Sequence, residues 1–311
     1  MIGDRGGDRL KRLACRGLLA TVLATPVPSR SLAQEWPPAN WTEAVEPVRI
    51  ADDLYYVGTA GLAAFLLVSD EGHILIDAPL AVNVPLILDN VRALGFDPSD
   101  IRVLVASHAH FDHVGGVAAM LEATGADLVL SEADAVFVRE GRDFGLGELE
   151  EGYPPATPDR IVNHLSTVRV GDIELTAHLT PGHTPGCTTW SGEVRIEGDP
   201  HTFVTVCSLS VLAGYVITGD DATYPGQAHD YCRSVAHLES LDPDIFLAAH
   251  TGWFGFGPKR RARAAGDAAA FVERDRYREY LAAARAAIET RLEEEGVPGG
   301  CEAVLGSEGT P

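Results

Sequence analysis

The chain has 311 residues, of which 46% are apolar, and its formal net charge at pH 7 is −21. This length allows one large domain or two small ones, and the apolar content is sufficient for a sizeable core. The negative charge excludes nucleic acid and an anionic membrane surface as expected partners, because both repel an acidic protein.

The N-terminal segment differs in composition from the rest of the chain. Several basic residues precede a short apolar stretch over residues 18–24, and Ser31-Leu32-Ala33 supplies the small residues of a cleavage site before Gln34. This layout predicts a secretory signal peptide over residues 1–33 and therefore a periplasmic mature protein. A disordered N-terminal tail is the alternative. No later segment is long and apolar enough to span a membrane, so we expect no membrane contact after signal cleavage.

Apolar runs and turn residues predict the elements of the first half of the chain. Strands are expected over residues 54–57, 63–68, 73–76, 101–106 and 127–130. Helices are expected over residues 85–94, 116–124 and 132–140. Gly95 and Gly125 end the first two helices, because glycine adopts the left-handed conformation that closes a helix without strain.

The segment after the strand at 101–106 is dense in side chains that bind metals. His108, His110, Asp112 and His113 follow this strand directly. Side chains two residues apart in an extended chain point the same way, so His108 and His110 can reach one ion together. Asp112 and His113 lie at the turn into the next helix and can face a second ion. A single histidine at the end of a strand is more often structural. Three imidazoles and one carboxylate at this spacing instead favour a zinc centre.

The second half of the chain alternates short strands with longer helices. A loop rich in Gly, Glu and Pro is expected first, and then strands within 160–189 and 194–208, a helix over 230–241, a strand over 245–249 and a helix over 271–295. Strand-rich halves with flanking helices predict one α/β domain over residues 34–300, with layers of helix, sheet, sheet and helix. Residues 301–311 are predicted to be a disordered tail.

Two further histidines have the setting of a ligand. His183 lies in the glycine-flanked turn Pro181-Gly182-His183-Thr184, and His250 follows the strand at 245–249. A scaffold holds the orientation of a side chain in such a position, as a metal ligand requires. The other histidines lack these settings and are interpreted as structural or solvated: His73, His164, His178, His201, His229 and His237.

The cysteines are too few for a disulfide scaffold. Five are present, and removal of the signal peptide would leave Cys187, Cys207, Cys232 and Cys301. The sequence leaves their pairing open.

The order of these motifs resembles the metallo-β-lactamase superfamily over about residues 48–290. The resemblance implies a four-layer αβ/βα sandwich with two mixed β-sheets and with metals in the groove between them. It implies two Zn²⁺ per chain, the first held by His108, His110 and His183 and the second by Asp112, His113 and His250. The implied nucleophile is a hydroxide that bridges the metals and that Asp112 helps to orient.

Two segments compete for the position from which related hydrolases, such as glyoxalase II and the lactonases, project a metal-bridging aspartate. Thr218-Gly219-Asp220 looks like that motif, whereas Ser208-Leu209-Ser210 follows the strand from which this ligand should project. The Ser-Leu-Ser segment is similar to subclass B3 metallo-β-lactamases, which lack the bridging acid. We favour this second alignment, which places Asp220 in a loop.

Resemblance to subclass B3 implies hydrolysis of the amide bond of penicillins, cephalosporins and carbapenems, which confers antibiotic resistance. We expect a monomer. Ser208 and Ser210 are expected to bind the substrate carboxylate, and Tyr215 either reaches the same end of the groove or only packs. One rival is a zinc hydrolase of the same fold that acts on another ester or lactone, and a second rival binds zinc without turnover. The chain departs from the family's frequent Asp-Gly-Gly at Asp77-Ala78-Pro79, which leaves the substrate range open.

Overall fold

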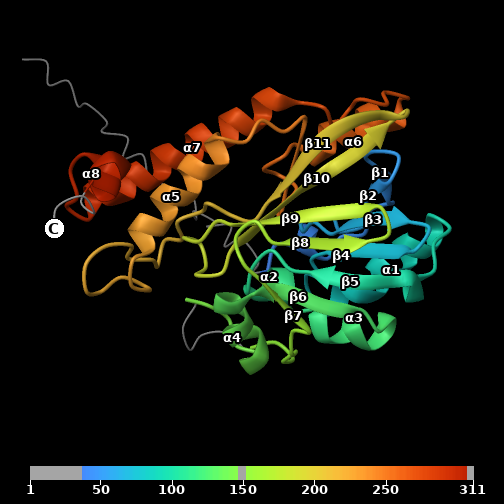
Figure 1. The fold of residues 1–311 in the computed structure, drawn as a ribbon, viewed down its shortest axis with the longest axis horizontal. Coiled ribbons are helices and arrows are strands. Elements are labelled where there is room, and N and C mark those ends of the chain that lie inside the picture. The colour runs from blue at the N-terminus through green and yellow to red at the C-terminus, as the bar shows by residue number, and fades with distance from the viewer. Residues whose placement is uncertain (1–36, 146–151, 307–311) are drawn as a thin grey trace, which may run out of the picture. The chain divides into compact units, whose positions relative to one another are not determined.

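The computed structural model describes residues 37–145 and 152–306, which form two mixed β-sheets (Figure 1). The first sheet has seven strands in chain order: β1 (Val48–Arg49), β2 (Leu54–Tyr56), β3 (Phe65–Ser69), β4 (Gly72–Ile76), β5 (Ile101–Val105), β6 (Asp127–Ser131) and β7 (Arg160–Val162). The second has five, in the order β12 (Ile245–Ala248), β11 (Asp199–Val206), β10 (Thr188–Ile196), β9 (Ile173–Leu179) and β8 (Thr167–Val170).

Alternate residues of the central strands in the first sheet face two different apolar cores. Ile76, Val103 and Val105 pack in the core that contains residues of both sheets. Leu75 and Leu104 belong to a second core, which contains residues of the covering helices. Successive strand residues point to opposite faces, so a strand buried on both faces has a continuous apolar sequence. β5 is buried in this way, which explains the apolar run that predicted a strand at this position.

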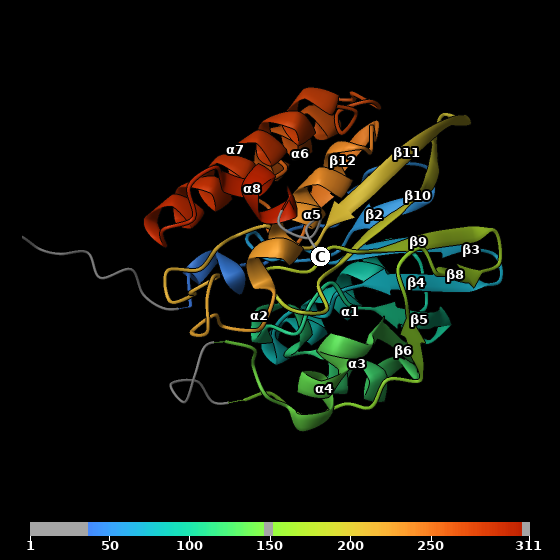
Figure 2. The same ribbon diagram turned by 60° about the vertical axis from the view of Figure 1, so that its left-hand side comes forward.

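Helices cover the outer face of each sheet (Figures 1 and 2). The first sheet packs against α1 (Val84–Ala93), α3 (Val117–Thr124) and α4 (Glu132–Glu140). The second packs against α5 (Gln227–Glu239) and α7 (Arg274–Glu294). The remaining helical segments are α2 (Phe111–Val114), α6 (Phe256–Ala264), α8 (Gly300–Gly306), η1 (Ala39–Trp41), η2 (Ala81–Asn83) and η3 (Pro98–Asp100). These layers confirm the predicted fold class.

The strand directions bring the predicted motifs to one edge of the sheets. β9 and β11 both pair antiparallel with β10, and β12 pairs parallel with β11, so β9, β11 and β12 run in the same direction. The loops that follow these three strands therefore leave the second sheet at the same edge. The Thr188 amide donates a hydrogen bond of 2.8 Å to the Ser107 carbonyl, which joins this edge to the loop after β5.

One helix of the structure was not predicted from the sequence, for a local reason. α6 was not expected, because Gly257, Pro258 and several basic residues leave the segment without an apolar period. Proline is tolerated in the first turn of a helix, where its missing amide would have no helical partner. The strands predicted within 194–208 belong to the hairpin of β10 and β11, whose turn at Glu197 and Gly198 has positive φ angles of 52° and 89° and so matches a tight two-residue connection.

The predicted disordered tail is wrong for residues 301–306. These residues belong to α8, because Cys301 is buried and forms a disulfide with Cys232 of α5. Residues 307–311 and the predicted signal peptide over 1–33 lie outside the described residues. Within the described part of the chain, no helix combines the length and the apolar character needed to cross a membrane.

Candidate metal centre

Three imidazoles converge between the two sheets at this edge. His108 and His110 come from the loop after β5, and His183 comes from the loop between β9 and β10. One ligand atom from each lies within 4.8 Å of the others. The ring centroid of His183 is 4.9 Å from that of His108 and 4.6 Å from that of His110. We call this group the first triad.

A second triad adjoins the first and includes a carboxylate. It consists of Asp112 and His113 from α2 and His250 from the loop after β12, with ligand atoms again within 4.8 Å. Nε2 of His113 lies 3.2 Å from Nε2 of His250. The Oδ2 atom of Asp112 lies 3.3 Å and 3.4 Å from these two nitrogens. The six side chains that the sequence singled out are therefore brought together as two groups of three.

Hydrogen bonds to the far side of each ring orient the first triad. His183 Nδ1 donates to the Ser210 carbonyl at 2.7 Å, and His110 Nε2 donates to the Phe144 carbonyl at 3.0 Å. His108 Nδ1 lies 3.1 Å from the hydroxyl of Ser107. Among the described residues, the other nitrogen of His108, Nε2, is buried and has no hydrogen-bond partner. A buried donor or acceptor is costly to leave unpaired, and this one belongs to a converging set of imidazoles, so the residues fit a metal ion.

Both triads open on one cavity of about 430 Å³, which is the size of a small-molecule site. Trp41, Phe111 and Trp253 form apolar walls, and Ser210 and residues 212–214 line it as well. His250 lies between the two tryptophans, with ring centroids 5.7 Å from Trp41 and 4.6 Å from Trp253. Among the described residues, none of those lining this cavity is a lysine or an arginine.

A comparison with protein families identifies the family to which this arrangement of side chains belongs. The model of the metallo-β-lactamase superfamily matches residues 61–250, a range that contains all six side chains of the two triads. The chain belongs to the metallo-β-lactamase superfamily. The centre is therefore that of a metal-dependent hydrolase, and the superfamily implies a divalent metal bound by these histidine-rich groups.

Several members of the superfamily are similar to this chain over most of the domain. The FEZ-1 metallo-β-lactamase from Legionella gormanii is 36% identical with a TM-score of 0.79, and the match covers 81% of this chain and 97% of that one. BJP-1, a subclass B3 metallo-β-lactamase of Bradyrhizobium japonicum, is 32% identical with a TM-score of 0.77, over 83% and 97% of the two chains. The N-acyl homoserine lactonase AttM of Agrobacterium fabrum is 28% identical over 209 residues, which are 57% of this chain and 75% of that relative.

Asp134 of α4 forms hydrogen bonds to both loops of the first triad, and this role was not predicted from the sequence. Its carboxylate accepts hydrogen bonds from the Ala109 amide at 2.9 Å, from the Thr184 hydroxyl at 2.8 Å and from the Gly186 amide at 2.8 Å. A side chain at Gly186 would meet the Asp134 carboxyl carbon at 2.6 Å, so this close approach requires glycine. In the sequence, Asp134 follows Ser131 at the start of a helix and resembles a capping residue only.

Asp77 supports the second triad in a similar way. It follows β4 with a positive φ of 64° and accepts hydrogen bonds from the amide and the hydroxyl of Ser107, at 2.6 Å and 2.7 Å. Its Oδ2 atom lies 3.6 Å from Nδ1 of His113. A carboxylate behind a ligating histidine fixes the orientation of the ring and makes it a better donor.

Burial and local charge give the two triads different protonation states. Burial lowers the pKa of His108 and His183 well below the usual range, and lowers that of His110 and His250 to about 4. Burial would lower the pKa of His113 as well, but contacts with Asp112 and Asp77 outweigh it and raise this pKa to about 10. Without metal, the first triad is therefore neutral at pH 7, and the second carries a proton on His113.

The predicted substrate-binding residues divide into one that lines the cavity and two that do not. Ser210 lines it. Ser208 is 1% exposed, and its hydroxyl accepts a hydrogen bond from the Ser210 amide at 3.1 Å. Tyr215 is 2% exposed, and its hydroxyl donates to the His183 carbonyl at 3.0 Å. Ser208 and Tyr215 are not among the residues that line the cavity, and their substrate contacts stay a prediction. Asp220 is exposed in a turn.

Proposed function

We propose that this protein hydrolyses the amide bond of β-lactam antibiotics and uses two zinc ions to do so. The observation that carries the proposal is the Ser208-Leu209-Ser210 segment after β11, where a lactonase would place a bridging aspartate. Within the described residues, the two triads include Asp112 as their only carboxylate. Similarity to BJP-1 and FEZ-1 over more than four-fifths of the chain supports the same conclusion.

The proposed ligands are His108, His110 and His183 for the first zinc, and Asp112, His113 and His250 for the second. When bound, zinc supplies a Lewis acid for the lactam carbonyl and lowers the pKa of water into the neutral range. The Asp112 carboxylate faces the cavity, where it can accept a hydrogen bond from the attacking water. The reaction adds this water across the C–N bond, so that the carbonyl carbon gains hydroxyl and the nitrogen gains a proton.

The walls of the cavity suit the remainder of a β-lactam. The tryptophans at 41 and 253 offer flat apolar surfaces for a substituent. Ser210 offers a polar contact for the substrate carboxylate in place of the predicted pair of serines. Because no basic residue is among those described at the cavity lining, the metals supply the main attraction for an anionic substrate.

An oxidising compartment is part of the proposal. Disulfides persist in the periplasm and are rare in the cytosol, and this protein has two, Cys187–Cys207 and Cys232–Cys301. They support the proposed export by an N-terminal signal peptide. We expect the mature protein to act as a monomer that confers antibiotic resistance.

A comparison of two substrates distinguishes the proposed function from that of the lactonase relatives. We expect kcat/KM for meropenem to exceed that for an N-acyl homoserine lactone by about a hundredfold or more, because a difference of one methylene or hydroxyl group alone changes kcat/KM by about 10- to 200-fold. Both rates are measured on one preparation of the zinc-loaded protein. A preference for the lactone would overturn the proposed substrate class while leaving the hydrolase assignment intact.

Zinc binding to the second triad should release a proton. His113 has a pKa raised to about 10, so it is protonated at pH 7, and a metal must displace this proton. The affinity of this triad for zinc should therefore rise with pH, about tenfold per unit between pH 5 and 9. The affinity of the first triad should stay nearly constant there, because burial keeps the pKa of its histidines low. Calorimetric titration in buffers of different ionisation enthalpy counts the protons; equal, pH-independent affinities would contradict this assignment.

A further inference from the structure

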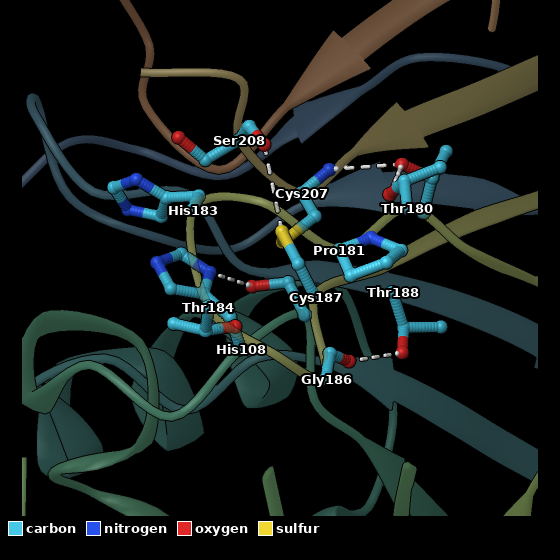
Figure 3. Close-up of a disulfide and its surroundings, with 12 residues drawn as sticks. His108, Thr180, Pro181, His183, Thr184, Gly186, Cys187, Thr188, Cys207 and Ser208 are labelled. Carbon is cyan, nitrogen blue, oxygen red and sulfur yellow. Dashed lines mark hydrogen bonds between the residues drawn. A yellow bond between two sulfur atoms is a disulfide. The ribbon is translucent and has the colours of Figure 1, made fainter. Parts of the chain in front are cut away.

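The disulfide between Cys187 and Cys207 lies directly against the first triad, and Figure 3 shows it with His108 and His183 beside it. Cys187 follows His183 by four residues in the loop between β9 and β10, and Cys207 follows the last residue of β11. Both cysteines are fully buried. The proposed hydrolysis gives these sulfur atoms no role.

His108 has two alternative sets of partners. A ring nitrogen of His108 lies within 4.8 Å of ligand atoms of His110 and His183, and a ring nitrogen of His108 also lies within 4.8 Å of the sulfur atoms of Cys187 and Cys207. The second set meets the same distance limit as the two triads of the metal centre. In the oxidised protein, the S–S bond occupies both sulfur atoms, so only the histidine set is available.

Contacts other than the S–S bond hold both cysteines in place. The Cys187 carbonyl accepts a hydrogen bond of 2.8 Å from the Thr180 amide. The Cys207 amide donates one of 3.3 Å to the Thr189 hydroxyl. The Cα atoms are 5.9 Å apart, and the Cys187 sulfur lies 3.5 Å from the Ser208 carbonyl oxygen (Figure 3). Breaking the S–S bond would therefore leave two thiols facing His108.

We propose that the reduced protein has a third metal site, formed by His108, Cys187 and Cys207, which competes with the first triad for His108. Thiolate and imidazole together select Zn²⁺ or Cu⁺. Two thiolates and a neutral imidazole neutralise a divalent ion, whereas three imidazoles leave two positive charges in a buried place, which is costly. The sulfur-containing set should therefore be preferred once the sulfur atoms are free, and the disulfide reserves His108 for hydrolysis.

The redox step is a two-electron reduction. A phosphine in water breaks the S–S bond, each sulfur gains a proton to form a thiol, and the phosphine takes up the oxygen of water as its oxide. The metal then displaces the two thiol protons into solvent. Because His108 belongs to both sets, a metal bound by the cysteines leaves the first triad with two imidazoles. The number of metals bound per chain should not rise on reduction.

Cobalt spectroscopy tests this site without relying on turnover. The protein is stripped of metal, reduced with a phosphine under argon, freed of reductant and loaded with Co²⁺, and its thiols are counted by alkylation and mass spectrometry. We expect a sulfur-to-cobalt charge-transfer band in the near ultraviolet for the reduced protein and none for the oxidised protein. The variant Cys187→Ala/Cys207→Ala, treated identically, should lack the band although it keeps Cys15, Cys232 and Cys301.

A single substitution covers the case in which the buried disulfide resists reduction. Cys207→Ala leaves one permanent thiol at Cys187 beside His108, and this variant should show a weaker band without any reductant. If neither the reduced protein nor this variant shows the band, or if the band persists in the double variant, the proposal is wrong. A failure of β-lactam turnover would not affect this result, because the readout is the cobalt spectrum.

Discussion

Replacing Asp112 with asparagine should lower kcat/KM for a β-lactam by about a thousandfold. The substitution keeps the size of the side chain but removes the only carboxylate that the described residues contribute to the two triads. A zinc ion contributes several kcal/mol of transition-state stabilisation, which corresponds to about three orders of magnitude in rate. Native mass spectrometry should find that the variant retains zinc at the first triad and loses it at the second.

Asp220→Asn is the matched control for this prediction. Asp220 occupies the rival position for a bridging aspartate, but it is exposed in a turn. We expect this variant to keep both zinc ions and its full activity, since substitutions at exposed positions seldom have large effects. A large loss for Asp220→Asn, together with a small one for Asp112→Asn, would show that the Ser-Leu-Ser alignment is wrong and would favour a lactonase-like centre.

Replacing Asp134 with alanine should weaken zinc binding at the first triad about 10- to 100-fold, which is the usual effect of losing a residue that orients metal ligands. Three hydrogen bonds from the loops that carry His108, His110 and His183 end on this carboxylate. Their loss frees both loops to move relative to each other. Competition with a fluorescent chelator measures the affinity of each zinc site, and the second triad should change little.

Two further variants separate this effect from a general loss of stability. Glu132→Ala alters an exposed residue in the same turn of α4 and should leave zinc binding unchanged. Thr184→Val removes one of the three hydrogen bonds to Asp134 and should weaken the first site severalfold in a folded protein. If both Asp134→Ala and Thr184→Val fold and bind zinc with the affinity of the original chain, Asp134 has no role in the centre.

The sequence was sufficient to predict the six side chains of the triads, because strand ends and tight turns place them. His108 and His110 follow the apolar run of β5 directly, and their spacing in an extended chain puts them on one side. His183 and His250 also follow strands, and parallel directions within the second sheet bring their loops to the same edge. Local pattern and sheet geometry together account for the convergence of the six side chains.

The residues that support the triads were not predictable, because contacts between distant segments define them. Asp134 meets Thr184 and Gly186 across 50 and 52 residues of sequence, and no periodicity records such a contact. The burial of Ser208 and Tyr215 was not predictable for the same reason, since it depends on contacts with distant segments such as the hydrogen bond from Tyr215 to the His183 carbonyl. The ordered helix α8 depends on a disulfide whose pairing the sequence left open.

Zinc-dependent turnover of a β-lactam is the most direct test of the proposed function. Chelator-stripped protein is titrated with zinc while nitrocefin and meropenem hydrolysis and the number of bound ions are measured on the same samples. We predict no turnover by the stripped protein, and full recovery as two zinc ions bind per chain. Turnover that survives removal of the metal, or binding of two zinc ions without hydrolysis of either compound, would contradict the proposal.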